Sequence, residues 1–232
     1  ERGMCKNRDC LYPKPCRELY VDHSDYLDVL KQVRALPKVK KVFIRSGIRY
    51  DYLMADRDRT FIKELCANHV SGTLKVAPEH SSPEVLSYMH KPSIDVFTGF
   101  AKEYFRENDR LGKKQYLIPY LISSHPGSTL RDAVELAEFL NRYGFVPDQV
   151  QDFYPTPATL ATCMYYTEMN PFTGENVYVA KDMEEKKMQR ALIHYNRPEN
   201  RQLVKKALIK AGREDLISVL LPPQNRKGKK RR

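Results

Sequence analysis

Short apolar runs alternate with helical patterns along this chain, and four of the runs end in polar residues, glycine or proline. The runs at residues 41–46, 73–77, 115–122 and 148–154 predict strands. Strands that alternate with helices are typical of βα units in a parallel sheet. Because parallel strands end at one edge of a sheet, we expect the four polar segments to meet on one face. In barrel-like α/β folds that face holds the active site.

Helical spacing of apolar residues marks the segments between and after these strands. The predicted helices cover residues 23–36, about 57–70, a short segment from 83, 94–108, 130–143, 182–195 and 199–211. Thr129 and Asp132 resemble a capping pair for the helix that Gly144 ends. Four strands do not close an eight-stranded barrel. The sequence therefore predicts either an open sheet or further strands upstream of Glu1.

Length and composition favour a globular protein. The chain has 232 residues, of which 41% are hydrophobic, so one domain with an appendage can bury a core. It has no apolar run of about 18 residues, and its first residues are neither a signal peptide nor an initiator methionine. We expect a piece of a longer polypeptide in the cytoplasm, with its five cysteines reduced.

The positive charge is concentrated near the C-terminus. Residues 181–232 hold 16 Lys and Arg against 6 Asp and Glu, which accounts for +10 of the net charge of +11. The segment 222–232 alone has six basic residues and no acid, so we expect a disordered tail. Two interpretations stay open for this tail: a solubilising terminus, or attraction to nucleic acid.

Several long motifs carry a family resemblance. They are residues 4–16, 42–50 (VFIRSGIRY), 74–80 (LKVAPEH), 115–129 (QYLIPYLISSHPGST) and 148–159 (DQVQDFYPTPAT). Together with Asn170-Pro171 and the C-terminal helices, these segments resemble the C-terminal portion of the YgiQ-like family of radical S-adenosylmethionine (SAM) proteins. Motifs of this length and number are far more specific than a lone glycine pattern.

The resemblance implies a fold and an activity. The family's fold is similar to a six-stranded partial (β/α) barrel, of which this chain would hold the last four parallel strands. The resemblance also implies a [4Fe–4S] cluster bound by a CxxxCxxC loop. It further implies SAM, which yields a 5′-deoxyadenosyl radical that abstracts hydrogen from the substrate. No CxxxCxxC occurs in this sequence. We therefore expect an incomplete, inactive part of a radical SAM enzyme whose cluster loop lies in the upstream half of the polypeptide.

The same resemblance sets the expected domains. They are a Cys- and Pro-rich loop at 1–20, the partial barrel at 21–160, a mostly helical family region at 161–221 and the basic tail at 222–232.

Candidate cofactor-binding residues lie at the predicted strand ends. They are Arg45, Gly47, Glu79, His80, His125, Gly127, Tyr154 and Pro155. A helix N-terminus attracts anions, and glycine lets the backbone approach a ligand. The resemblance implies SAM contacts at Glu79, His125, Gly127, Tyr154 and Pro155. Arg45 or Arg49 could pair bidentately with a carboxylate or phosphate. The alternatives are a capped βα turn around Pro126 and Ser128, and a salt bridge between these arginines and Glu79.

Three cysteines near the N-terminus are candidate metal ligands. Cys5, Cys10 and Cys16 are separated by four and five residues, a spacing wider than that of common zinc knuckles. An auxiliary metal or cluster site and reduced thiols that pack a loop both remain open.

Two functions of different classes follow. The first is part of a radical SAM enzyme whose substrate is unknown, and this part binds SAM and substrate at its strand ends. The alternative is a binding module that docks RNA or an acidic partner through its basic C-terminal region. Upstream sequence with CxxxCxxC separates the two, because only the enzyme needs it. The sequence predicts no contact with a membrane.

Overall fold

The computed structural model describes residues 5, 8–44, 47–148 and 150–223. Arg45 and residues 224–232, which hold most of the predicted basic tail, lie outside the described residues. Two compact units divide the chain: unit 1 comprises residues 1–121 and 147–149, and unit 2 comprises residues 122–146 and 150–232. Within the described ranges, no helix has the length and apolarity needed to cross a bilayer.

A small open parallel sheet forms part of this mixed α/β chain. Its strands are β1 (Thr73–Glu79), β2 (Tyr116–Ser123) and β3 (Val150–Asp152), in the order β1-β2-β3. β1 and β2 pair in parallel, with Thr73 opposite Tyr116. These strands confirm three of the four predicted ones, although β3 is shorter than predicted.

The segment predicted as the first strand takes another conformation. Residues 41–44 form no strand, and residues 45 and 46 lie outside the described ranges. The N–H of Ile44 donates to the carbonyl of His69 at 2.9 Å, so this donor is used at the end of a helix and is not available to a sheet neighbour. The described chain therefore has three strands where we predicted four, and it does not show a barrel.

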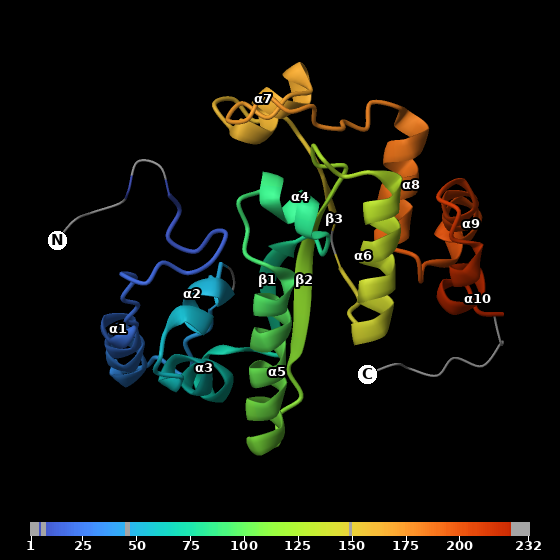
Figure 1. Cartoon of the computed structure of the whole chain (residues 1–232). Helices are drawn as coiled ribbons and strands as arrows, with labels where there is room; N and C mark the ends of the chain where they lie inside the picture. The colour runs from blue at the N-terminus through green and yellow to red at the C-terminus, as the bar shows by residue number, and fades with distance from the viewer. Residues whose placement is uncertain (1–4, 6–7, 45–46, 149, 224–232) are drawn as a thin grey trace. The chain divides into compact units, whose positions relative to one another are not determined.

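Unit 1 combines β1 and most of β2 with short helices and one long helix (Figure 1). The helices are α1 (Ser24–Ala35), α2 (Tyr50–Ala55), α3 (Thr60–Glu64), the π-helical turn η1 (Leu65–His69), α4 (Pro83–Tyr88) and α5 (Ile94–Arg110). The helix predicted at 57–70 appears as α3 continued by η1, and α2 was not predicted. The helices predicted at 23–36, from 83 and at 94–108 are confirmed.

The core of unit 1 depends on an aromatic stripe along α5. Phe97, Phe100 and Tyr104 are all fully buried, at the 3- and 4-residue spacing that puts them on one face of a helix. The ring of Tyr50 on α2 lies 5.6 Å from that of Phe97 in an edge-on arrangement. Aromatic residues bury a large area, so this stripe is a main source of stability for unit 1.

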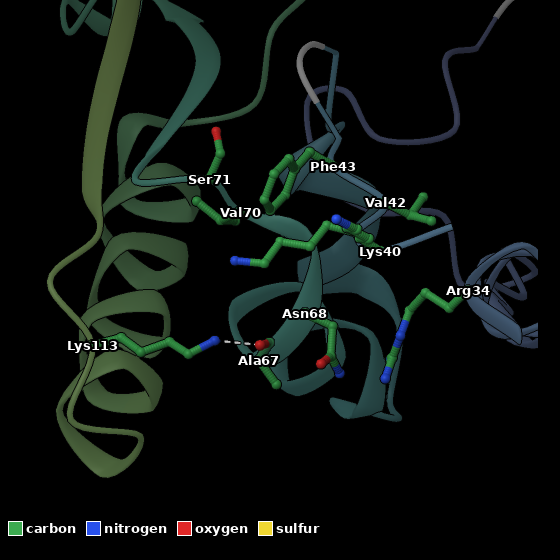
Figure 2. A pocket seen from close by; sticks show the side chains of 10 residues that line it. Arg34, Lys40, Val42, Phe43, Ala67, Asn68, Val70, Ser71 and Lys113 are labelled. Atoms are coloured by element: carbon green, nitrogen blue, oxygen red, sulfur yellow. Dashed lines mark hydrogen bonds between the residues drawn. The ribbon is translucent and has the colours of Figure 1, made fainter. Parts of the chain in front are cut away.

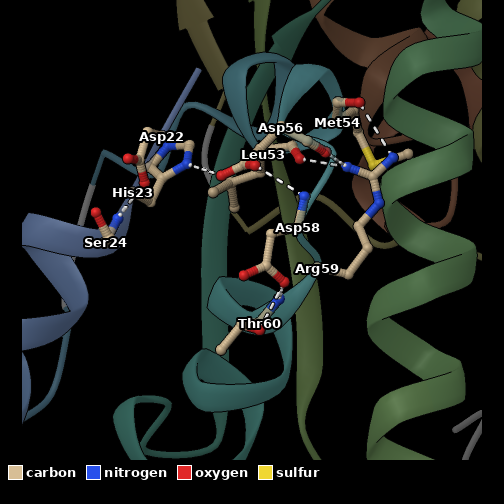
Figure 3. A network of polar contacts seen from close by, with 9 residues as sticks. All are labelled: Asp22, His23, Ser24, Leu53, Met54, Asp56, Asp58, Arg59 and Thr60. Atoms are coloured by element: carbon tan, nitrogen blue, oxygen red, sulfur yellow. Dashed lines mark hydrogen bonds and ion pairs between the residues drawn. The ribbon is translucent and has the colours of Figure 1, made fainter. Parts of the chain in front are cut away.

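An arginine closes the carboxyl end of α2 (Figure 3). Arg59 donates to the carbonyls of Leu53 at 2.7 Å and Met54 at 3.1 Å, and also to the carbonyl of Asp56. It forms an ion pair with Glu103 on α5 at 3.3 Å. The last carbonyls of a helix have no partner within the helix, and a guanidinium with five donors can satisfy several of them at once. Arg59 therefore fixes the turn between α2 and α3.

Unit 2 is a helical cluster built on α6 (Figure 1). Its helices are α6 (Leu130–Tyr143), α7 (Leu160–Thr167), α8 (Met183–Ile193), η2 (Pro198–Asn200), α9 (Arg201–Lys210), η3 (Glu214–Leu216) and α10 (Ile217–Leu220). Thr129 and Asp132 form the predicted capping box, and Gly144 ends α6 with φ +69°. Buried Val134, Leu192 and Leu208 join α6, α8 and α9 in one core.

α7 was not predicted because its sequence lacks an apolar stripe. Met164 is its only fully buried residue, whereas Tyr166 is 71% exposed. The helix begins instead at Thr159, whose side chain accepts a hydrogen bond from the N–H of Thr162 at 3.2 Å. Local capping, rather than burial of a face, defines this helix.

We predict that Arg59→Gln destabilises unit 1 by about 2 kcal/mol, because the substitution removes an ion pair and leaves partly buried carbonyls without a donor. Urea unfolding followed by circular dichroism measures the change in the free energy of unfolding. Arg57→Gln is the matched control, because Arg57 is exposed and has no ion pair among the described residues. Equal loss of stability in the two variants would show that charge alone, and not the bonds of Arg59, causes the effect.

Candidate functional site

The carboxyl end of β1 departs from regular strand geometry. The register pairs Val76 with Pro119 and then Glu79 with Leu121, so three steps along β1 match two along β2. Pro78 and Pro119 have no N–H to donate to the ladder, and proline within a sheet occurs at edges and bulges. Glu79 itself has φ +69°, a conformation that non-glycine residues seldom adopt. The bulge therefore gives Glu79 a direction that a regular strand would not.

Glu79 lies in a largely buried environment beside one cation. The Nζ of Lys91 lies 3.5 Å from the Oε1 of Glu79 and also donates to the carbonyl of Ala77 at 2.9 Å. Burial raises the pKa of Glu79, although Lys91 opposes that rise. Burial also raises the pKa of the Tyr50 phenol, with a further contribution from Glu79. A carboxylate with a raised pKa beside a buried phenol is the type of environment found at binding and catalytic sites.

His80 follows Glu79 but has a structural contact. It is 1% exposed, and its Nδ1 accepts a hydrogen bond from the N–H of Ser82 at 3.0 Å. Ser82 caps the N-terminus of α4. His80 thus holds the turn from β1 into α4, and any role in binding stays a prediction.

The predicted arginine group is only partly described. Arg45 lies outside the described residues, and Gly47 is exposed with φ +78°. Arg49 donates to both oxygens of Asp51, at 2.9 and 2.6 Å. The bidentate pairing expected for an arginine is therefore present, but its partner is a neighbouring side chain on α2 and not Glu79.

The turn after β2, in unit 2, is a second candidate segment. Ser124 has φ +59°, and His125 is 4% exposed. The Nδ1 of His125 lies 2.8 Å from the carbonyl of Pro126, and its ring lies edge-on to Phe153 at 5.2 Å. Burial lowers the pKa of His125 to about 4. His125 is therefore neutral at pH 7 and offers an imidazole ring without charge.

Hydrogen bonds to Tyr178 and to Gln189 of α8 hold the same turn. The N–H of Gly127 donates to the carbonyl of Tyr178 at 2.7 Å. Ser128 donates to the Oε1 of Gln189 at 3.0 Å, and the Nε2 of Gln189 donates back to the carbonyl of Ser128 at 2.9 Å. Gln189 and Ser128 are each 1% exposed, so this reciprocal pair is sheltered from water and fixes the turn firmly.

The segment after β3 is open to solvent. Tyr154 is 76% exposed and Pro155 is half-buried, so neither forms a closed pocket within unit 2. Their predicted contact with a cofactor stays a prediction.

The N-terminal cysteines lie in a turn of unit 1. The N–H of Cys16 donates to the carbonyl of Cys10 at 2.8 Å, Cys5 is exposed, and Cys10 and Cys16 are half-buried. Among the described residues, no group of three or more His, Cys, Asp or Glu side chains is arranged to hold a metal ion. The auxiliary metal site stays a prediction. Cys66, by contrast, is a buried core thiol, and burial raises its pKa to about 12.

Sequence reasoning missed three residues of these segments. Lys91 lies in a loop with no motif, so only the structure shows its contact with Glu79. Tyr50 belongs to a helix that was not predicted. Gln189 did carry a signal, because it is a polar residue beside Met188 and Leu192 on the buried face of α8.

Comparisons with known proteins show which sequences this chain is similar to. Residues 148–231 match a family described as a domain of unknown function (DUF3362). The chain is 57% identical over 217 residues to a UPF0313 protein of Clostridium botulinum (strain 657 / Type Ba4), which covers 94% of this chain and 34% of that protein. A UPF0313 protein of Clostridium perfringens (strain SM101 / Type A) is 57% identical over 215 residues, covering 93% of this chain and 32% of that protein.

The class of protein that these findings define is an α/β chain similar to part of UPF0313 proteins. The chain spans about one third of the length of the curated relatives it matches. The activity of the whole protein is therefore a matter for proposal.

We predict that stability falls between pH 7 and pH 5 because of His125. Its pKa is about 4 when folded and about 6.5 when unfolded. Between these values the unfolded chain binds the extra proton, so the stability that the neutral ring provides above pH 6.5 is lost as the pH falls toward 4. The loss from pH 7 to pH 5 is about 2 kcal/mol.

Urea unfolding of the wild type and of His125→Gln at both pH values checks this prediction. The variant should show a pH dependence smaller by about 2 kcal/mol, whatever its stability at pH 7. The same pH dependence in both proteins would contradict the assignment to His125.

Proposed function

We propose that this chain forms the C-terminal part of a radical SAM enzyme of unknown substrate and contributes contacts to SAM and substrate at the carboxyl ends of its strands. Two observations support the proposal: the five long motifs that resemble the family, and the match to about one third of longer UPF0313 proteins. In the whole protein, strands from the upstream part of the polypeptide would extend the three-stranded sheet toward a partial (β/α) barrel.

The observation that carries the proposal is the backbone conformation at two strand ends. Glu79 at the end of β1 and Ser124 directly after β2 both have positive φ. Such conformations are costly for residues other than glycine, and they cluster at ligand clamps and active sites. Both occur beside buried polar side chains, which supports a binding role at the strand ends, where α/β folds place their ligands.

The side chains at these ends fit the polar groups of SAM. SAM carries ribose hydroxyls, an ammonium group and a carboxylate. Glu79 can accept hydrogen bonds from hydroxyl or ammonium groups, and Lys91 can pair with a carboxylate. In the second segment, the neutral ring of His125 and the backbone of Gly127 are suited to ribose or adenine contacts. Tyr154 and Pro155 would line the adenine side.

The cluster does not fit this chain. Its five cysteines, at positions 5, 10, 16, 66 and 163, include no CxxxCxxC sequence. The upstream part of the polypeptide would therefore bind the [4Fe–4S] cluster. That cluster, once reduced, would supply the electron, and SAM would supply the group that abstracts hydrogen. The residues described here would orient SAM and exclude water from it.

We predict that the longer polypeptide, reconstituted anaerobically with iron and sulfide and then reduced, converts SAM to 5′-deoxyadenosine, whereas the 232-residue chain alone does not. Liquid chromatography measures the product. Glu79→Gln in the longer protein should raise the KM for SAM at least about tenfold, because it removes a charged acceptor at the strand end.

Glu84→Gln is the matched control, because Glu84 is an exposed residue of α4 near the same turn. Its KM should stay at the wild-type value. Absence of 5′-deoxyadenosine from a longer protein whose absorption spectrum shows an intact cluster would refute the proposed function. A normal KM in Glu79→Gln would refute the role of Glu79 alone.

We predict that Cys5, Cys10 and Cys16 bind iron or zinc in the chain purified without oxygen, because the turn between Cys10 and Cys16 already brings two of their backbones together. Elemental analysis should show metal in the wild type and in Cys163→Ser, which changes an exposed cysteine on α7. The triple Cys→Ser variant should contain none. Equal metal content in the wild type and the triple variant would show that these thiols only pack the loop and bind no metal.

A further inference from the structure

A cavity of about 310 Å³ lies in unit 1. Its walls combine basic, aromatic and hydroxyl side chains: Arg34, Lys40, Lys41, Lys113, Phe43 and Ser71. Figure 2 shows the side chains of Arg34, Lys40 and Lys113 around this space. The volume is in the range of small-molecule sites, and the charged lining suits an anion.

Two of the four cations are already held in place. Arg34 pairs with Glu64, whose Oε1 also accepts from the Nδ2 of Asn68 at 3.0 Å. Lys113 donates to the carbonyl of Ala67 and, at 3.2 Å, to that of Cys66. Such contacts immobilise long side chains before a ligand arrives, which lowers the entropic cost of binding. The Arg34 pair also neutralises the charge of Glu64, and Lys113 supplies a donor to two carbonyls of η1.

The other two cations keep their charge available. Lys40 and Lys41 are exposed, and neither has an ion pair with a described carboxylate. The Nζ of Lys41 lies 5.9 Å from the centre of the Phe43 ring. Phe43 is 42% exposed, so it presents an aromatic face next to two free ammonium groups. A phosphate can pair with such ammonium groups, and a flat ring can stack on the phenyl group.

The cavity is at the opposite end of β1 from Glu79. Val70 and Ser71 precede the first residue of β1, Thr73, and Lys113 precedes the first residue of β2, Tyr116. A strand of seven residues is about 20 Å long. A ligand in the cavity would therefore not touch Glu79, and this site is distinct from the proposed SAM site.

We infer that this cavity binds a small phosphorylated ligand with a flat ring, the chemistry of a nucleotide. The phosphate pairs with Lys40 and Lys41, and the ring lies on Phe43. No covalent bond is made or broken when this ligand binds. The site is a binding site only, and it does not depend on the proposed radical SAM activity.

Isothermal titration of the 232-residue chain with adenosine 5′-monophosphate, and separately with inorganic phosphate, tests the inference. The double variant Lys40→Gln/Lys41→Gln should bind both probes at least about tenfold more weakly. Phe43→Ala should weaken the binding of adenosine 5′-monophosphate while leaving that of inorganic phosphate unchanged, because phosphate has no ring to stack. Higher salt should weaken both.

The control is Lys205→Gln/Lys210→Gln, which removes the same charge from two exposed lysines of α9. It should bind both probes as the wild type does. Equal weakening in the two double variants would show a non-specific effect of net charge and would overturn the inference. So would wild-type binding of single-stranded RNA without measurable binding of either small probe. Circular dichroism of each variant verifies that it is folded.

Discussion

The arrangement of unit 1 depends on where the β1–β2 ladder stops. From Thr73 to Val76 the two strands pair without interruption, and between Val76 and Glu79 the register shifts. Pro78 and Pro119 explain the position of the shift, since each lacks the N–H that a ladder bond needs. The hydrogen bonds lost there leave the backbone free to take positive φ at Glu79. A sequence feature that weakens the sheet thus places a half-buried carboxylate at the carboxyl end of β1.

A second constraint is that buried carbonyls need donors. In unit 1, long side chains supply many of them. Arg59 donates to the end of α2, and Lys113 and Gln115 donate to the carbonyls of η1, with Gln115 reaching Cys66 at 3.0 Å. This explains why the predicted helix at 57–70 becomes α3 followed by a π-helical turn, because side chains satisfy carbonyls that the wider turn leaves exposed. The same bonds fix Lys113 at the wall of the basic cavity.

How much the sequence could predict differs between elements for physical reasons. α5 and α6 were predictable because each buries a regular apolar face, and α6 also has a capping box and a terminal glycine. α7 was not, because only Met164 is buried. The strand predicted at 41–46 does not form in the described residues, because the N–H of Ile44 donates to the carbonyl of His69. Glu79 and His125 were identified from strand-end motifs, whereas Lys91 is brought to Glu79 by tertiary packing that no local pattern reveals.

The two ends of β1 carry groups of opposite charge, and the paired strand separates them. At the carboxyl end, a carboxylate with a raised pKa lies beside a single lysine. At the amino end, four cations surround a cavity. The N–H of Tyr116 donates to the carbonyl of Gly72 at 2.8 Å, so β2 is joined to β1 from its first residue. Regular pairing extends over Thr73–Val76, and the irregular backbone lies at the Glu79 end. Anion binding at the cations would therefore leave the conformation of Glu79 unchanged, since the bulge and not the ladder sets it.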